Sequence, residues 1–439
     1  MNMNYALSYI NAALVRKCHT VLFQKRASSV KYTNLRVVKY ATPIVTRRSR
    51  QPSFHPQTMN NLHVSLTEFR NESRVLKETK SITEAGIAKH VYVASLHAPD
   101  QSEHESISDK VTLNRISLWT RRLPKKSWAH AAKYIEFSFR ILFRYRKCDI
   151  GIINIHHIAL LPLGILLKYF YGAVLVYDTH ELETEVEGLH GLRKTLLKLV
   201  EKTCVGYCDQ IFVVSEKIAD WYVEAYGGPR PVVVFNSPLY KEHPRSDKLR
   251  KTLGIPAETI IFLYQGGFFE GRGIEIILET FESLSDTRAS VVFMGYGPLI
   301  ERIQTASYAY RNIYFHPAVP PGDLLNYTAS ADVGLSLIEG SCLSYLYSMP
   351  NKLFEYTMAG LPVIVSNMPE MATYVTENCL GVVMEAHSRV ALLEAIKRLK
   401  NSNLDLLKHN AHITSKAYSW EIQEQKMLRA YRELLDRKA

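Results

Sequence analysis

The sequence predicts an α/β protein made of two domains, each built around a parallel β-sheet. The chain has 439 residues, 47% hydrophobic and 22% charged, values typical of a globular protein with two or three domains. Short apolar runs alternate with amphipathic stretches of helical length, an order that favours strands joined by crossover helices. The alternation occurs on both sides of a polar stretch at residues 240–250, so the domain boundary is predicted near residue 240.

A basic leader precedes the patterned part of the chain. Residues 1–67 contain ten Lys and Arg residues and no Asp or Glu, so they account for most of the formal net charge of +12. One interpretation of residues 1–58 is an organelle transit peptide. The other is sequence upstream of the true start, which we favour because the regular pattern begins just after Met59. We expect residues 1–58 to be disordered or to lie outside the fold.

The first predicted domain covers residues 59–240. Its elements are expected as strands at 62–67, 90–96, 152–155, 173–177, 210–215 and 232–236, and as helices at 72–84, 160–171, 192–207 and 216–226. The strand at 173–177 runs into Asp178, His180 and Glu181. Ligands of open parallel sheets bind outside the carboxyl ends of the strands, so these ionisable residues form a candidate site.

Residues 121–147 differ from the rest of this domain. They carry nine Lys and Arg residues against a single acid, Glu136, interleaved with six aromatic residues. Two interpretations stay open: an amphipathic helix that lies on an anionic membrane surface, or a core-facing helix with a solvated basic face. Nucleic acid is disfavoured because the chain contains no recognisable nucleic-acid module.

The apolar runs and the cysteines indicate whether the chain spans a membrane and whether its thiols are reduced. The longest apolar run, residues 158–167, is well short of the roughly 20 residues that a membrane-spanning helix needs. The six cysteines show no paired spacing of the kind that holds zinc, so we interpret them as reduced thiols of a cytoplasmic protein.

The second predicted domain covers residues 241–420, followed by a helix at 421–439 that is expected to pack back toward the first domain. Strands are expected at 260–265, 290–294, 313–315, 333–337 and 361–365, with a helix at 274–284. After the strand at 260–265, Gly266 and Gly267 let the backbone approach a ligand closely. Arg272 lies at the entrance of the next helix, where a diphosphate would meet both its charge and the helix N-terminus.

The stretch 348–370 predicts a loop, a short helix, a stop at Gly360 and a buried strand. Pro350 suits the first helical turn. Asn351 and Glu355 share one helical face, and Lys352 adds positive charge near the helix start. These residues could bind a phosphate and a sugar hydroxyl, but a merely solvated polar face explains the same spacing.

Several segments together resemble the group 1, or family 4, glycosyltransferases. They are Gly266-Gly267 with Arg272-Gly273, MGYGP at 294–298, SADVGLSLIE at 330–339, PNKLFEYTMAGLPVIVS at 350–366, PE at 369–370, VYDTHE at 176–181 and CDQIFVVSE at 208–216. The resemblance covers roughly residues 60–435 and is most specific at 350–370. It implies the GT-B fold, in which two Rossmann-like domains face each other across a cleft.

The resemblance also implies an activity. The enzyme would move a sugar from a UDP- or GDP-linked donor to a lipid-linked or polysaccharide acceptor, with retention of configuration and without a metal or other cofactor. Its setting would be cell-surface polysaccharide biosynthesis, in the cytoplasm or at the inner membrane face.

Site residues follow from the resemblance position by position. Arg272 matches the basic residue that meets the donor diphosphate, Glu355 the glutamate that binds the nucleotide ribose, and His180 the histidine that reaches the transferred sugar. The remaining donor-binding positions are Gly266, Gly267, Gly295, Pro317, Val319, Asn351 and Lys352, of which Pro317 and Val319 match the turn that reads the base.

Two departures from the family pattern keep other hypotheses open. The family's first glutamate falls at Tyr347, with Glu339 the nearest acid, and the glycine-rich turn after the first strand is missing. A catalytically inactive GT-B scaffold would explain both departures. A sugar-nucleotide epimerase is a further alternative, whereas a dehydrogenase is disfavoured because no GxGxxG opens a strand–helix unit.

Overall fold

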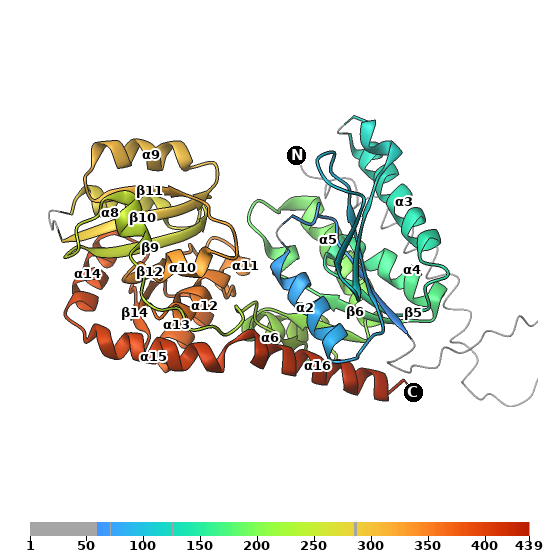
Figure 1. The fold of residues 1–439 in the computed structure, drawn as a ribbon. Helices are drawn as coiled ribbons and strands as arrows, with labels where there is room; N and C mark the ends of the chain where they lie inside the picture. Colours follow the sequence, from blue (N-terminus) through green and yellow to red (C-terminus); the bar gives the residue numbers. More distant parts are fainter. Residues whose placement is uncertain (1–58, 71, 125, 285–287, 439) are drawn as a thin grey trace, which may run out of the picture. The chain divides into compact units, whose positions relative to one another are not determined.

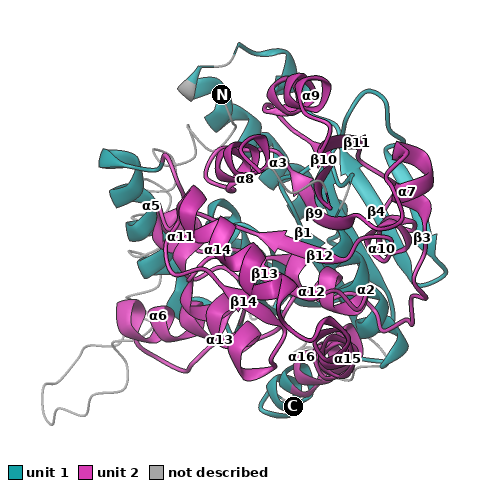
Figure 2. Ribbon diagram, turned by 90° about the vertical axis from the view of Figure 1, so that its left-hand side faces the viewer, with its two compact units in different colours: residues 1–179, 189–211, 430–439 teal, residues 180–188, 212–429 magenta. Residues whose placement is uncertain are grey.

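The computed structural model describes residues 59–70, 72–124, 126–284 and 288–438. The predicted leader, residues 1–58, lies outside the described residues. The chain divides into two compact units, which Figure 2 shows in different colours. Of the described residues, unit 1 comprises those between 59 and 179, between 189 and 211 and between 430 and 438, and unit 2 comprises those between 180 and 188 and between 212 and 429.

The first sheet has eight strands among the described residues, in the order β3-β4-β2-β1-β5-β6-β7-β8. Its strands are β1 (Asn60–Val64), β2 (Val91–Leu96), β3 (His104–Ser108), β4 (Val111–Ile116), β5 (Ile150–Ile155), β6 (Val174–Asp178), β7 (Gln210–Val213) and β8 (Val232–Val233). β3 pairs antiparallel with β4, whereas β1 pairs parallel with both β2 and β5. The sheet is therefore parallel apart from its edge, as expected for strands buried beneath crossover helices.

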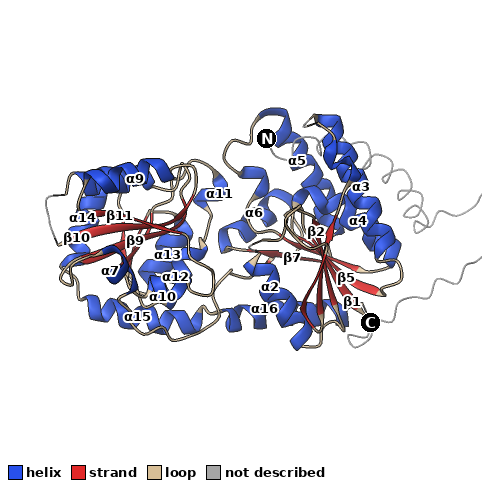
Figure 3. Ribbon diagram, turned by 45° about the horizontal axis from the view of Figure 1, so that its top comes forward, coloured by secondary structure: helices blue, strands red, loops and turns tan. Residues whose placement is uncertain are grey.

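The helices that connect these strands are α2 (Ser73–Glu84), α3 (Ser127–Arg144), α4 (Leu161–Tyr171), α5 (Gly191–Cys204) and α6 (Glu216–Tyr226). Short 3-10 helices occur at Trp119–Arg122, Ile158–Leu160, Glu183–Glu185 and Val205–Tyr207. Figure 3 shows helices on both faces of each sheet. The strands β5 and β6 are buried throughout, which explains their continuous apolar sequence.

The second sheet has six strands among the described residues, in the order β11-β10-β9-β12-β13-β14, and its pairs are parallel. Its strands are β9 (Ile260–Gly267), β10 (Ala289–Tyr296), β11 (Ile313–Pro317), β12 (Val333–Ser336), β13 (Val363–Val365) and β14 (Gly381–Val383). The accompanying helices are α7 (Lys248–Leu253), α8 (Ile274–Glu282), α9 (Ile300–Ala309), α10 (Leu324–Thr328), α11 (Leu343–Leu346), α12 (Asn351–Met358), α13 (Pro369–Glu377), α14 (Arg389–Lys400), α15 (Leu404–Ala417) and α16 (Trp420–Asp436) (Figure 1).

The register of the second sheet sets the position of the candidate site. Gly266 in β9 is paired with Gly295 in β10, and Gly295 is paired with Pro317 in β11. Three residues that lie far apart in the sequence therefore form one row at the carboxyl edge of the sheet. This is the edge where open parallel sheets bind their ligands.

The structure confirms the predicted fold class, two α/β domains with parallel sheets, and corrects several local predictions. The strands β3 and β4 were missed. Every residue of β3 is exposed, so this edge strand shows no apolar alternation. β4 is mostly buried, but polar residues (Thr112, Asn114 and Arg115) interrupt its apolar run. Pro350 is the N-cap of α12, in an extended conformation with ψ of 139°, and does not lie inside the first turn. Gly360 ends this helix with a φ of 74°, as predicted.

No helix among the described residues combines the length and the apolar character that are needed to cross a bilayer. The described cysteines (Cys148, Cys204, Cys208, Cys342 and Cys379) are free thiols, in agreement with the sequence interpretation. Cys18 lies outside the described residues.

Candidate functional site

A narrow glycine-lined edge forms where β9 and β10 end. A Cβ atom on Gly295 would lie 1.9 Å from the carbonyl oxygen of Gly266, so no side chain fits at position 295. Gly266 has a φ of +112°, a conformation that L side chains rarely adopt. The Gly267 carbonyl accepts a hydrogen bond from the Tyr264 hydroxyl at 2.9 Å, which fixes the start of the following loop.

The loop that follows β9 places Arg272 beside an aromatic ring. Gly271 and Gly273 have φ values of +71° and +78°, and a Cβ atom on Gly273 would lie 2.1 Å from the Leu337 carbonyl oxygen. The guanidinium carbon of Arg272 lies 4.4 Å from the centre of the Tyr345 ring. This stacking leaves the edges of the planar guanidinium to donate hydrogen bonds to an anion.

Lys352, on the first turn of α12, extends toward the end of β9. Its ammonium nitrogen lies 3.7 Å from the centre of the Tyr264 ring, and a Cβ atom on Gly266 would lie 3.9 Å from it. Desolvation and the nearby charge of Arg272 lower the pKa of Lys352 to about 7, while Glu355 acts in the opposite sense. Two cationic side chains thus converge on one place, and an anion bound there would relieve their repulsion.

Glu355 lies one turn further along α12 and is held by a residue that the sequence analysis missed. The side-chain amide of Gln265 donates a hydrogen bond of 2.6 Å to Glu355 Oε2. Gln265 Oε1 accepts a hydrogen bond of 2.7 Å from the Thr328 hydroxyl, and Gln265 is buried. The sequence offers one indication of this role: Gln265 is a polar residue that follows an apolar run and directly precedes Gly266.

His180 belongs to a loop of unit 2 that contacts the Arg272 loop. Desolvation raises the pKa of Glu181, and the positive charges of Arg272 and His180 oppose that rise, which places both residues near Glu181. A Cβ atom on Gly271 would lie 3.3 Å from Glu187 Oε2, so the other end of the 180–188 segment also touches the loop. His180 itself is half-buried.

The remaining predicted positions lie at the rim of this arrangement. Pro317 ends β11 beside Gly295 and is exposed, while Val319 follows it in the next turn and is half-buried. The His316 ring nitrogen Nδ1 lies 2.7 Å from the Pro317 carbonyl oxygen, which orients the backbone there. Asn351 is exposed at the first position of α12. The structure thus brings Gly266, Gly267, Gly295, Arg272, Lys352 and Glu355 together around the end of β9, whereas Val319 and Asn351 lie at its rim.

The position of the missing family glutamate is also visible. Tyr347 caps the carboxyl end of α11 and is half-buried. The Glu339 backbone N–H donates to the Gly271 carbonyl at 2.9 Å, but its carboxylate lies 3.3 Å from His387 Nε2. The side chain of Glu339 is therefore engaged with His387, while its backbone supports the Arg272 loop.

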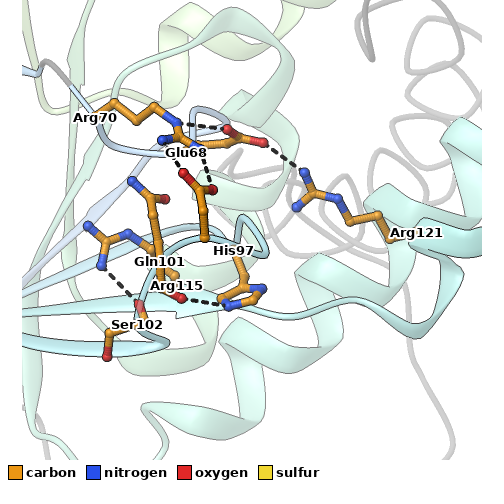
Figure 4. Close-up of polar contacts among 8 residues, drawn as sticks. Glu68, Arg70, His97, Gln101, Ser102, Arg115 and Arg121 are labelled. Carbon is orange, nitrogen blue, oxygen red and sulfur yellow. Dashed lines mark hydrogen bonds and ion pairs between the residues drawn. The ribbon is translucent and has the colours of Figure 1, made fainter.

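Unit 1 carries its own charged residues in the loops that follow its strands (Figure 4). Arg70 makes two hydrogen bonds to the Asp100 carboxylate, at 2.5 and 2.6 Å, and Glu68 lies between Arg70 and Arg121. The Arg115 guanidinium donates to the Ser102 carbonyl at 2.9 Å. Exposed ion pairs contribute little to stability because water screens them, so their main effect is to position these loops.

Comparison with known proteins identifies the family to which this chain belongs. The family model described as Glycosyl transferases group 1 matches residues 245–420, and the model described as Glycosyltransferase Family 4 matches residues 73–238. TuaC of Bacillus subtilis, named as a teichuronic acid biosynthesis glycosyltransferase, is 23% identical over 206 residues. That match covers 46% of this chain, and it spans only half of the relative's length.

Two solved structures share the fold. Sucrose-phosphate synthase from Thermosynechococcus elongatus superposes with a TM-score of 0.70 at 19% identity, covering 86% of this chain and 100% of that chain. HepE from Anabaena, solved with UDP-glucose, gives a TM-score of 0.61 at 13% identity, covering 86% and 99%. The two family models together span most of residues 73–420, and the folds agree. The chain belongs to the group 1 (family 4) glycosyltransferases.

Proposed function

We propose that this protein transfers a sugar from a nucleoside diphosphate donor, UDP- or GDP-linked, to a lipid-linked or polysaccharide acceptor. The observation that carries the proposal is the convergence of Arg272, Lys352 and Glu355 on the glycine-lined end of β9. The crystal structure of HepE with UDP-glucose and the name of TuaC, which concerns teichuronic acid, support the donor and acceptor classes.

The residue types suit the chemistry of glycosyl transfer. Departure of the nucleoside diphosphate breaks the bond between the sugar and the diphosphate, and negative charge develops on the departing oxygen. Fixed cations next to this oxygen stabilise the transition state, and Arg272 and Lys352 supply two of them. Transfer therefore proceeds without a metal ion in this proposal, and we expect retention of configuration, as the family resemblance implies.

The other residues have separate roles in the proposal. Glu355, oriented by Gln265, accepts hydrogen bonds from the ribose hydroxyls. The turn at Pro317 and Val319 contacts the base, and His180 contacts the transferred sugar. The acceptor binds to unit 1, in the charged loops that follow its strands.

A nucleotide screen tests the proposal directly. The full chain is titrated calorimetrically with UDP, GDP and their common sugar conjugates, with and without a metal chelator. We expect selective binding of one nucleotide that the chelator does not change. If none of them binds, the donor site is absent, and the replacement of the family glutamate by Tyr347 then favours the catalytically inactive scaffold.

The pH dependence of nucleotide binding reports on Lys352. Its pKa of about 7 in the free protein means that Lys352 is charged below pH 7 and largely neutral above pH 8. A bound diphosphate raises this pKa, so binding above pH 7 takes up a proton, and affinity falls as pH rises, by up to about tenfold per unit. Calorimetry in buffers of different ionisation enthalpy measures the proton uptake.

The matched variants for this measurement are Lys352→Met and Lys397→Met. Lys352→Met should bind the nucleotide more weakly and lose the proton uptake between pH 7 and 8. Lys397→Met removes an exposed lysine of α14 and should behave like the wild type. Proton uptake that persists in Lys352→Met would assign the titration to another group.

The proposed setting is the cytoplasmic face of a membrane, contacted through residues 121–147. The aromatic residues of α3 fall into two groups. Tyr134 and Phe137 are buried in the core, whereas Trp128, Phe139 and Phe143 are exposed. The Tyr171 hydroxyl of α4 donates to the Leu142 carbonyl at 2.7 Å, so α4 lies against α3. Aromatic residues of α4 (Tyr169 and Phe170) and basic residues of this region (Arg122, Lys126, Arg144, Arg146 and Lys147) are exposed as well.

Vesicle sedimentation tests this contact. We expect the full chain to bind vesicles containing phosphatidylglycerol and not pure phosphatidylcholine, with binding that weakens as salt screens the surface charge. The double variant Phe139→Ser and Phe143→Ser should bind about tenfold more weakly or worse, because two inserted rings are lost. Tyr308→Ser, at an 89% exposed position of α9, is the control. Salt-insensitive or absent binding would leave residues 121–147 as a helix with a solvated basic face.

A further inference from the structure

A buried polar cluster lies at the carboxyl end of the unit 1 sheet, and no step of the proposed transfer uses it. His63 is in β1, His156 follows β5, Asp178 ends β6, and Arg74 and Glu78 are one turn apart on α2. Each of these five residues is at most 3% exposed. Burial of so many ionisable groups is costly unless they are paired or coordinate an ion.

The contacts within the cluster form a chain that runs from β1 to α2. His63 Nδ1 lies 2.9 Å from His156 Nε2, and His156 Nδ1 lies 3.3 Å from Asp178 Oδ2. Arg74 donates to both oxygens of Asp178, at 2.6 and 3.0 Å, and its Nε also lies 2.9 Å from Glu78 Oε1. Arg74 is therefore shared between the two carboxylates.

Glu78 is the least satisfied member of the cluster. Among the residues that the structure describes, neither of its oxygens accepts a hydrogen bond. Its Oε1 has an ion pair with Arg74 Nε, but that N–H already donates to Asp178. Buried polar atoms left in this state usually indicate an ion or water at the site.

We propose that His63, His156 and Glu78 bind a divalent transition-metal ion of the zinc type. One ligand atom from each of the three residues lies within 4.8 Å of the other two. Imidazole nitrogen and carboxylate oxygen together are the ligands that such ions prefer. The ion would give the Glu78 carboxylate a partner and would join α2 to β1 and to the residue that follows β5.

The surrounding residues suit this role. Asp178 Oδ2 lies 3.3 Å from His156 Nδ1, so Nε2, which faces His63 Nδ1, is the nitrogen that would hold the ion, in the carboxylate–histidine–metal arrangement of metal sites. Binding requires the two facing imidazole nitrogens to separate from 2.9 Å to about 3.3 Å, the spacing of two ligands at tetrahedral zinc. The ion has a structural role within unit 1, whereas the donor residues Arg272, Lys352 and Glu355 belong to unit 2.

Metal content and melting temperature test the proposal. The full chain is purified without a polyhistidine tag, stripped with chelator and titrated with Co²⁺. We expect one ion per chain and a visible cobalt spectrum without the thiolate charge-transfer band that the Cys204 and Cys208 thiols would produce. Chelation should lower the melting temperature of the wild type and leave its affinity for UDP or GDP unchanged.

Two substitutions make the test specific. Glu78→Gln keeps the shape of the side chain but should lose the ion and the effect of chelator on melting. His104→Gln removes an exposed histidine of β3 and should keep both. If the folded wild type takes up no cobalt, or if Glu78→Gln binds it as well as the wild type does, the cluster is a proton-sharing network without an ion. Should Glu78→Gln fail to fold, the titration of the stripped wild type decides alone.

Discussion

Replacing Arg272 by alanine should slow cleavage of the sugar nucleotide about 100- to 1,000-fold, the usual effect of removing one charged stabiliser of a developing anion. Arg272 is held by a loop in which Gly271 and Gly273 have positive φ, and its guanidinium stacks on Tyr345. Lys352 remains in the variant, but it lacks the planar group that can donate two hydrogen bonds to a diphosphate. The measurement is the rate at which the nucleotide is released from the donor sugar selected in the nucleotide screen.

Two further variants identify the cause of the loss. Arg272→Lys keeps the charge but loses the planar group, so its rate should fall between those of the wild type and Arg272→Ala. Arg302→Ala removes an exposed arginine of α9 and should leave the rate unchanged. A wild-type rate in Arg272→Ala would remove Arg272 from the diphosphate site.

Replacing Glu355 by glutamine should weaken nucleotide binding or turnover by about 1.5–3 kcal/mol, the range for a hydrogen bond that involves a charge. This corresponds to a roughly ten- to 150-fold loss of nucleotide affinity or of turnover rate. The substitution keeps the shape of the side chain beside Gln265, but it removes the negative charge and replaces one acceptor oxygen by an NH2 group. Calorimetry measures the affinity for the nucleotide and for the free nucleoside.

The nucleoside comparison separates the ribose contact from the diphosphate contact. Glu355→Gln should weaken the nucleoside and the nucleotide by the same factor, whereas Lys352→Met should affect the nucleotide alone. Glu394→Gln, at an exposed glutamate of α14, is the control. Unchanged affinity and turnover in Glu355→Gln would exclude Glu355 from the site.

Much of the candidate donor site could be predicted from the sequence because its residues lie in short contiguous segments. Gly266, Gly267 and Arg272 occupy one strand–loop–helix junction, and Lys352 and Glu355 occupy one helix. Local rules for glycine, helix starts and buried strands apply to such segments directly. The supporting contact from Gln265 to Glu355 was missed because it joins residues 90 positions apart.

Residues 121–147 show that the sequence alone also could not predict which side of a single helix is buried. From the sequence, this segment is basic and aromatic, and two interpretations stay open. Only the packing of α3 shows that Tyr134 and Phe137 enter the core while Phe139 and Phe143 stay exposed. The segment has a core-facing side and an exposed aromatic side, and the vesicle experiment tests what the exposed side does.

By itself, the sequence determined the two α/β halves, their parallel sheets and the family, since these follow from local periodicity and from contiguous motifs. The tertiary structure alone decided which polar residues meet. Parallel pairing aligns Gly266, Gly295 and Pro317 in one row, and α2 carries Glu78 to His63 of β1 and to His156, which follows β5. The physical reason is that crossover connections bring together residues that are dozens of positions apart, and local periodicity holds no information about such distant partners.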